Sequence, residues 1–241
     1  MGDADELIVS IWRGRETGGL VEYRVPARAN QTVLDVVTEV QRRHEPSLAY
    51  RFACRVGVCG SCAMTVNGTP RWTCRTHVRK VAADRRLTIE PLRNMPRIKD
   101  LACDMNEFFG KWRRAGGVFR GSRTRDDPPM AVDPQSRNRQ AANAAIECIN
   151  CAVCYSACDV VAARPDYLGP AALNRAWTLI NDVRHAGRSA TLAQATADGG
   201  CASCHTLGSC AQHCPVGISP TASIAGLKRL SLLSFLRRTP E

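Results

Sequence analysis

The chain has 241 residues, enough for two modest domains. Lysine and arginine number 33 against 22 aspartate and glutamate, so the net charge of +11 favours acidic partners, nucleic acid or anionic lipid. The thirteen cysteines are an odd number, and the first residues carry neither the basic nor the apolar region of a secretory signal peptide. We therefore expect reduced, metal-binding thiols rather than a secreted disulfide scaffold.

The first hundred residues have the pattern of a small mixed α/β unit. Thr32 is placed to begin a helix, because an apolar face repeats after it at helical spacing until Pro46. The Asn67-Gly68 pair is a strong signal for a tight hairpin turn. The strands that we expect are 7–12 and 20–25 as a first hairpin, 63–66 and 69–74 as a second, and 87–89 as a closing strand.

The composition changes after Pro96, and helical periodicity replaces the strand pattern. The stretch from Arg120 to Arg139 is rich in arginine and proline, and Pro128-Pro129 cannot lie inside a helix, so we interpret it as a linking segment. Helices are expected over 101–112, from Pro170 to near Gly187 with Val183 on the apolar stripe, and from Ser219-Pro220 onward. The second half is therefore predicted to be all-helical.

One group of cysteines has the C-x4-C-x2-C…C spacing of plant-type ferredoxins. Two irons bridged by sulfide need four thiolates on a curled loop, and Gly57 and Gly60 allow backbone amides to turn toward the sulfurs. The turn at Asn67-Gly68 returns the chain so that the last cysteine lies beside the others. The predicted [2Fe-2S] ligands are Cys54, Cys59, Cys62 and Cys74.

A second group has the spacing of bacterial two-cluster ferredoxins, in which the fourth cysteine of each run ligates the other cluster. In the partner run Leu207 occupies the position of the second cysteine, so one iron would lack a thiolate and face an apolar side chain. We infer a [4Fe-4S] cluster held by Cys148, Cys151, Cys154 and Cys214, and a [3Fe-4S] cluster held by Cys158, Cys204 and Cys210.

Two cysteines remain outside these three sets. Cys103 lies in the helix expected over 101–112 and is interpreted as a small core residue. Cys201 has no assigned role, and its spacing from Cys204 is that of a zinc knuckle. With Cys148 and Cys151 this pair would complete a four-thiolate zinc site, an alternative that leaves the other cysteines unexplained.

The chain resembles the iron-sulfur subunit of succinate dehydrogenase or fumarate reductase over nearly its whole length. Segments outside the ligands match as well, including Asp100-Leu101 and Gly169-Pro170. The motifs that carry the resemblance are Cys54-Arg55-x-Gly57-x-Cys59-Gly60-Ser61-Cys62, Cys148-x2-Cys151-x2-Cys154-x3-Cys158, and Cys204-His205-x4-Cys210-x3-Cys214-Pro215. The order of three clusters along one chain makes this resemblance specific.

The resemblance implies an α+β protein in two parts. Residues 1–100 would form a β-grasp 2Fe-2S ferredoxin-like domain. Residues 101–241 would form an all-helical, bacterial-ferredoxin-like domain carrying the 4Fe-4S and 3Fe-4S clusters. Electrons would pass between FAD in a flavoprotein subunit and a quinone beside membrane-anchor subunits. The dicarboxylate chemistry belongs to the flavoprotein, so this chain alone would catalyse no substrate conversion.

The family also implies a quinone end and a location. His205 matches a histidine close to the quinone, whereas the family's tryptophan after Cys158 is absent and 159–163 reads Asp-Val-Val-Ala-Ala. The stretch 199–227 has no charged residue and would offer a surface to apolar anchor subunits. The subunit would lie peripherally on the cytoplasmic face of a bacterial cell membrane, with no nucleic-acid partner.

Two other functions fit parts of the pattern. The ligand spacing also allows the iron-sulfur subunit of a different flavoprotein-linked quinone or thiol reductase, which co-purification with a succinate-oxidising flavoprotein would exclude. A basic zinc module that binds nucleic acid would be colourless and would bind DNA with strong salt dependence. Brown colour and acid-labile sulfide would exclude that second reading.

Overall fold

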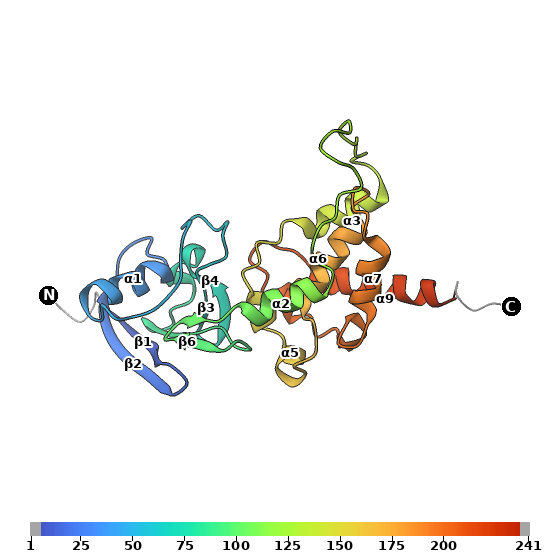
Figure 1. Cartoon of the computed structure of the whole chain (residues 1–241). Helices are drawn as coiled ribbons and strands as arrows, with labels where there is room; N and C mark the ends of the chain where they lie inside the picture. The colour runs from blue at the N-terminus through green and yellow to red at the C-terminus, as the bar shows by residue number, and fades with distance from the viewer. Residues whose placement is uncertain (1–5, 237–241) are drawn as a thin grey trace. The chain divides into compact units, whose positions relative to one another are not determined.

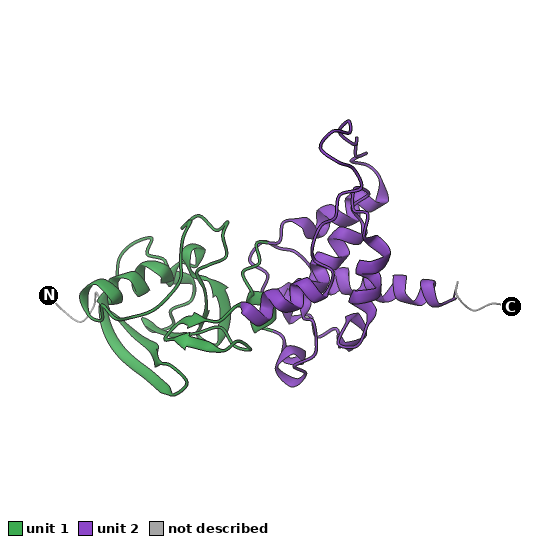
Figure 2. Ribbon diagram, in the orientation of Figure 1, with its two compact units in different colours: residues 1–105, 149–157 green, residues 106–148, 158–241 purple. Residues whose placement is uncertain are grey.

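A computed structural model describes residues 6–236, and Figure 1 shows their helices and strands in chain order. The chain divides into two compact units (Figure 2). Unit 1 holds the described residues up to Met105 together with Ile149–Ala157. Unit 2 holds Asn106–Cys148 and the described residues from Cys158 onward. Residues 149–157 thus belong to the N-terminal unit although they lie in the second half of the sequence.

Unit 1 is built on a five-stranded mixed sheet with the order β2-β1-β5-β3-β4. β1 and β5 pair in parallel, and the other neighbours pair antiparallel. Both predicted hairpins and the closing strand are confirmed, although the second hairpin ends at Trp72 and Thr73–Arg75 is a 3-10 turn (η2). The strands are β1 Glu6–Gly14, β2 Gly18–Pro26, β3 Ala63–Val66, β4 Thr69–Trp72 and β5 Arg86–Glu90.

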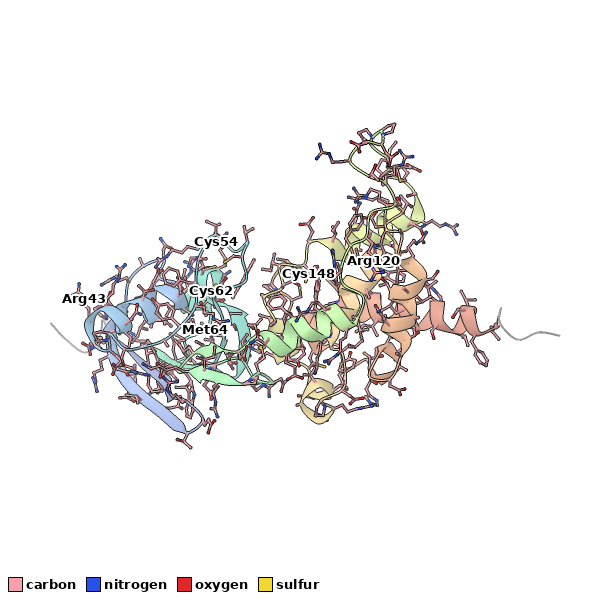
Figure 3. The ribbon with its side chains drawn as sticks, viewed as in Figure 1. Arg43, Cys54, Cys62, Met64, Arg120 and Cys148 are labelled. Atoms are coloured by element: carbon pink, nitrogen blue, oxygen red, sulfur yellow. The ribbon has the colours of Figure 1, made fainter. Side chains whose placement is uncertain are left out.

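Helix α1 (Val33–Arg43) begins where the sequence predicts it. The Thr32 hydroxyl accepts a hydrogen bond from the Asp35 amide at 3.2 Å, and the Asp35 carboxylate accepts one from the Thr32 amide at 3.0 Å, so a capping box fixes the start. Arg43, labelled in Figure 3, lies in the last turn, where its charge suits the helix dipole. The apolar face of α1 packs on the sheet with Leu7, Val9, Ile11, Val25, Met64, Leu87 and Ile89.

The helix expected over 101–112 is partly wrong. Residues Arg97–Lys99 (β6) and Ala102–Cys103 (β7) form a small hairpin, and helix α2 begins only at Asn106 and ends at Arg114. Asp100 turns the chain between the two strands with a φ of +49°, a conformation that a helix cannot contain. Cys103 is buried, as expected of a core residue, but it lies in β7 rather than in a helix.

The cause of this turn is a buried carboxylate. Asp100 is 1% exposed, and its oxygens accept hydrogen bonds from the amides of Gly14 and Ala49, each at 2.9 Å, and from Arg13 Nε at 3.0 Å. Burial works to raise the pKa of Asp100, but these donors outweigh it and hold that pKa below its ordinary value.

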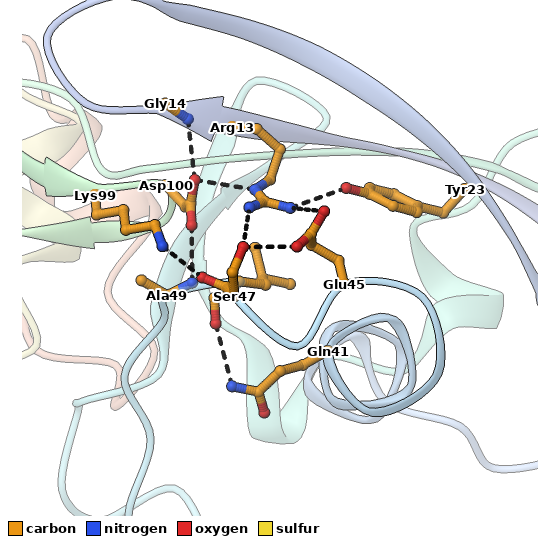
Figure 4. A network of polar contacts seen from close by, with 10 residues as sticks. Arg13, Gly14, Tyr23, Gln41, Glu45, Ser47, Ala49, Lys99 and Asp100 are labelled. Atoms are coloured by element: carbon orange, nitrogen blue, oxygen red, sulfur yellow. Dashed lines mark hydrogen bonds and ion pairs between the residues drawn. The ribbon is translucent and has the colours of Figure 1, made fainter.

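Arg13 extends this group of contacts across unit 1 (Figure 4). Besides Asp100, its guanidinium pairs with Glu45 at 2.9 Å and donates to the hydroxyls of Tyr23 at 3.1 Å and Ser47 at 2.9 Å. These residues come from both strands of the first hairpin, the loop after α1 and the β6–β7 turn. One guanidinium therefore connects four segments that are remote in the sequence.

Unit 2 is helical, as predicted, and α6 is its central helix. α6 packs against α2, α3, α7 and α9. The buried Asn174 of α6 donates to the carbonyl of Ala145 at 3.0 Å and accepts from Ser223 at 2.8 Å, which joins α3, α6 and α9. The helices are α2 Asn106–Arg114, α3 Arg137–Ile146, α5 Asp159–Ala163, α6 Pro170–Ile180, α7 Arg188–Thr196, α8 Ser209–Gln212 and α9 Pro220–Leu236.

Three details of unit 2 differ from the sequence predictions. α6 ends at Ile180, so Val183 lies beyond it and is exposed rather than on a buried stripe. Helices α3 and α7 were not predicted, and the last residues of the expected linking segment form the start of α3. Within residues 6–236 no helix has both the length and the apolar composition needed to cross a bilayer.

Candidate iron-sulfur sites

The first group of predicted ligands lies in unit 1, with Cys54, Cys59 and Cys62 in the loop between α1 and β3 and Cys74 in η2. Cys62 and Cys74 are buried against Leu34 of α1, whereas Cys54 and Cys59 are half-buried. Thr73 donates its amide at 3.2 Å and its hydroxyl at 2.7 Å to the carbonyl of Cys62. These two bonds explain why the chain returns after the second hairpin with Cys74 beside Cys62.

The sulfur atoms of this loop accept hydrogen bonds from its backbone. Cys54 Sγ accepts from the amides of Val58 at 3.3 Å and Cys59 at 3.4 Å, and Cys59 Sγ accepts from the Cys54 amide at 3.5 Å. On the other side, Cys62 Sγ accepts from the Cys74 amide at 3.4 Å. Amides that point at thiolate sulfur stabilise its negative charge, which is the environment that iron-sulfur ligation requires.

Two glycines allow this curled path. Gly57 and Gly60 have φ values of +79° and +71°, which L side chains rarely adopt. A Cβ on Gly60 would lie 2.7 Å from Cβ of Cys151, and a Cβ on Gly57 would lie 2.9 Å from the ring of Trp72. Both positions therefore exclude any larger residue, and the role predicted for them in turning amides inward agrees with the geometry.

The thiols of this loop differ in acidity. Hydrogen bonds from the Val58 and Cys59 amides lower the pKa of Cys54 to about 6. Burial, followed by the neighbouring Cys62, raises the pKa of Cys74 to about 12. Iron binds thiolates, so ligation at Cys74 would release its proton. Three thiols of the loop, together with Cys74 of η2 and the amides that point at the sulfurs, fit a [2Fe-2S] cluster.

Unit 2 contains a hollow lined by three further cysteines. Burial raises the pKa of Cys158 and of Cys210. Cys204 Sγ accepts from the Thr206 amide at 3.4 Å, and Cys210 Sγ lies 3.2 Å from the Thr221 hydroxyl. The lining comprises Cys158, Asp159, Val160, Tyr167, Pro170, Cys204, His205, Thr206, Leu207, Gly208, Ser209, Cys210, Thr221 and Ile224. Three thiols and no fourth in this lining fit a three-iron cluster.

Leu207 lines the same hollow but is 61% exposed. It follows Thr206, which has a φ of +60°, and precedes Gly208 at +82°, so the chain turns sharply around this position. From the sequence we expected the Leu207 side chain to face the iron that lacks a thiolate. The structure puts Leu207 at the edge of the hollow, with most of its surface facing outward.

Tyr167, which lines this hollow, and Lys228, which contacts the backbone of Cys204, gave no signal in the cysteine spacing. Tyr167 is 1% exposed, and burial, with the thiols of Cys204 and Cys158 adding to it, raises its pKa. Lys228 of α9 donates to the carbonyl of Cys204 at 2.7 Å. His205 is exposed at the edge of the hollow. Tyr167 and Lys228 reach the site through tertiary packing, which the spacing of the cysteines does not encode.

The predicted [4Fe-4S] ligands are divided between the units. Cys151 and Cys154 belong to unit 1, whereas Cys148, labelled in Figure 3, and Cys214 belong to unit 2. Within the described residues no three His, Cys, Asp or Glu side chains converge as ligands of a single metal ion do. An iron-sulfur cluster does not require such convergence, because its thiolate ligands bind different irons. Cys201 is buried, and burial raises its pKa.

Comparison with known proteins decides the family. Residues 8–110 match the family described as 2Fe-2S iron-sulfur cluster binding domain, and residues 144–218 match the 4Fe-4S dicluster domain. The fumarate reductase iron-sulfur subunit of Mycobacterium tuberculosis is 33% identical over 220 residues, which cover 90% of this chain and 87% of that protein. The chain belongs to the succinate dehydrogenase and fumarate reductase iron-sulfur subunit family.

Other members of this family agree with the assignment. The mitochondrial succinate dehydrogenase iron-sulfur subunit 1 of rice is 33% identical over 215 residues, covering 88% of this chain and 76% of that protein. A chain in the structure of the Mycobacterium smegmatis Sdh1 complex in the apo form superposes with a TM-score of 0.82 at 27% identity, covering 93% of this chain and 95% of the other.

These findings confirm the resemblance noted in the sequence and the α+β fold class. An N-terminal 2Fe-2S domain of β-grasp type, with a mixed sheet, is followed by a helical 4Fe-4S dicluster domain. The chain is the iron-sulfur, electron-transfer subunit of a succinate dehydrogenase or fumarate reductase, and as such is part of an enzyme complex.

Proposed function

We propose that this iron-sulfur subunit carries electrons between the FAD of a flavoprotein subunit and a membrane quinone, with residues 1–100 and 101–241 as its two functional domains. The observation that carries the proposal is the match of two cluster-binding domains in one chain. The proposed ligands are Cys54, Cys59, Cys62 and Cys74 for [2Fe-2S], Cys148, Cys151, Cys154 and Cys214 for [4Fe-4S], and Cys158, Cys204 and Cys210 for [3Fe-4S].

When bound, the clusters supply one-electron carriers whose potentials depend on charge, hydrogen bonding and exposure. The protein sets these properties through its own groups. In unit 1 the amides of Val58 and Cys59 lie against Cys54 Sγ and stabilise negative charge there. In unit 2 the hollow is lined by Leu207 where a fourth thiolate would otherwise stand. Cluster type is one of the factors that set a reduction potential, so a three-iron cluster here would differ in potential from the other two clusters.

His205 is proposed to act at the quinone end. It directly follows the proposed ligand Cys204 and is exposed at the edge of the hollow. An imidazole N–H at this position can donate a hydrogen bond to a quinone carbonyl oxygen, and can supply a proton there as charge arrives. The neighbouring helix α5 begins with Asp159 and has no tryptophan, so His205 would act without that partner.

The proposed partners follow from the same role. A flavoprotein subunit would provide the FAD and the dicarboxylate site. Membrane-anchor subunits would receive the uncharged 199–227 stretch and hold the complex on the cytoplasmic face of a bacterial cell membrane. The Sdh1 complex of M. smegmatis, which contains a chain similar to this one, supports assembly into a complex of that kind.

The cluster content tests the proposal directly. We expect about nine iron atoms per chain in anaerobically purified protein, from clusters of two, four and three irons, with a matching amount of acid-labile sulfide. EPR spectroscopy should resolve a reduced [2Fe-2S] signal and an oxidised [3Fe-4S] signal. One zinc per chain with no sulfide would contradict the proposal.

The His205→Ala variant tests the quinone end. We expect iron content, assembly and succinate oxidation with an artificial flavin-level acceptor to be unchanged, while quinone reduction falls at least tenfold, because the carbonyl loses its donor. Steady-state assays with both acceptors measure the difference. Gln212→Ala is the matched control, since Gln212 is exposed in the same uncharged stretch but does not line the hollow. Unchanged quinone kinetics in assembled His205→Ala would place the quinone elsewhere.

A further inference from the structure

The two halves of helix α9 have different surroundings. Its first half is packed into unit 2, where Ser223, Ile224 and Leu227 are buried. Its last turns, residues 231–236, extend past the other helices of that unit as the red end of the ribbon in Figure 1. None of these six residues is buried. The exposed fractions of Leu232, Leu233 and Phe235 are 59%, 45% and 66%.

The exposed apolar side chains gather on one side of the helix. At about 100° per residue, Leu232, Leu233 and Phe235 fall within an arc of about 160°. Ser231 and Ser234 lie on the opposite side, and the Ser234 hydroxyl donates to the carbonyl of Ser231 at 2.7 Å. This hydrogen bond satisfies the hydroxyl within the helix itself. The last turns of α9 are therefore amphipathic, and their apolar side contacts no part of the described chain extensively enough to bury it.

The charged residues nearest to these turns in the sequence are all positive. α9 contains no aspartate or glutamate. Arg229, one turn before Leu232 and Leu233, is exposed, and Arg237 and Arg238 follow in the sequence outside the described residues. Lys228 does not contribute to this surface, because it is held by the carbonyl of Cys204. An apolar segment with cations on both sides matches a membrane interface, where anionic headgroups lie above acyl chains.

We propose that residues 231–236 of α9 bind directly to an anionic membrane surface. Leu232, Leu233 and Phe235 enter the boundary between headgroups and acyl chains, and Arg229 reaches the lipid phosphates with its long stem along the apolar side. An apolar protein surface would match the leucines and the phenylalanine but gives no reason for the cations Arg229, Arg237 and Arg238 next to them in the sequence. This contact is independent of which cysteines hold which cluster, so the proposal stands apart from the proposed function.

Vesicle sedimentation of the full chain tests the proposal without any other subunit present. We expect binding to vesicles of phosphatidylcholine with phosphatidylglycerol, and at least tenfold weaker partitioning for the triple variant Leu232→Ser, Leu233→Ser, Phe235→Ser. Val118→Ser with Val183→Ser is the matched control, since both valines are comparably exposed in unit 2 at 54% and 40%. This control should bind as the unmodified chain does. Iron content and circular dichroism verify that each variant is folded.

Two further variants separate the apolar and the charged contributions. Arg229→Gln should weaken binding to anionic vesicles several-fold and leave binding to pure phosphatidylcholine unchanged, whereas Arg125→Gln, at a 95% exposed side chain, should do neither. The chain has four tryptophans, so the emission that Phe235→Trp adds to that of the unmodified chain should shift to the blue and be quenched by brominated lipid tails.

Three results would overturn the proposal. Equal partitioning of the triple variant and the unmodified chain would show that these side chains are not the contact. Vesicles that change the emission of Phe235→Trp no more than that of the unmodified chain would place the helix end in water. Binding that appears only when vesicles carry a membrane-anchor subunit would assign the apolar side to a protein surface instead.

Discussion

Replacing Leu207 with cysteine is expected to raise the iron content by about one atom per chain and to remove the oxidised [3Fe-4S] EPR signal. The introduced thiolate would stand at the position of the second cysteine in the two-cluster spacing, at the edge of a hollow already lined by Cys158, Cys204 and Cys210. The reduction potential depends on the type of cluster, so converting the site from three irons to four should change its potential and slow electron delivery to quinone. Iron analysis, EPR potentiometry and quinone assays measure the three effects.

Leu207→Ala is the matched control for this variant, because it removes the same apolar side chain without adding a ligand. It should keep the three-iron signal. If Leu207→Cys also keeps that signal while its thiol is shown to lie near the cluster, the geometry of the hollow, and not the missing ligand, determines the number of irons.

Asp100→Ala should lower the free energy of unfolding of unit 1 by about 3–5 kcal/mol, the cost of breaking a buried ion pair from one side. The substitution leaves the amides of Gly14 and Ala49 without their acceptor and the guanidinium of Arg13 without its buried partner. Denaturant unfolding followed by circular dichroism measures the change. Asp126→Ala removes an exposed carboxylate and should leave the unfolding curve nearly unchanged.

The same carboxylate gives a pH dependence with a defined sign. The pKa of Asp100 is lowered in the folded state, so its contribution is fully present above the unfolded value of about 3.9 and is lost as pH falls through the lower folded value. Unfolding curves of the unmodified chain and of Asp100→Ala should therefore converge as the pH is lowered below about 4. Curves that stay equally far apart at every pH would show that the carboxylate is not the stabilising group.

The elements predicted correctly from sequence are those whose signals are local. The Thr32 cap, the repeating valines of α1 and the Asn67-Gly68 turn all act within a few residues. The error at 101–112 has a distant cause, because the amide of Gly14 and the side chain of Arg13 fix the turn at Asp100 from more than eighty residues away. Periodicity within a short window contains no information about such a partner.

Helices α3 and α7 were missed for a different reason. Their buried residues are small, Ala142 and Ala145 in α3 and Thr191 and Ala195 in α7, so they lack the stripe of large apolar side chains that predicts a helix. Small residues suit them because they pack closely against the central helix α6. The same distinction applies to the candidate sites. The cysteines were predicted because their spacing is a local signal, whereas Lys228 was missed because it reaches Cys204 from another helix.

The discontinuity of unit 1 has a consequence for the order in which a ribosome makes this chain. Residues 149–157 complete the unit, because the Arg93 amide donates to the Ser156 hydroxyl at 2.9 Å and Asn94 donates to the carbonyl of Tyr155 at 3.0 Å. When Met105 leaves the ribosome these acceptors are still unmade, and at typical synthesis rates they follow roughly 3–10 s later. The N-terminal unit therefore finishes folding only after Asn106–Cys148 of the helical unit has been translated, and the nascent chain must keep an unfinished surface protected in the interval.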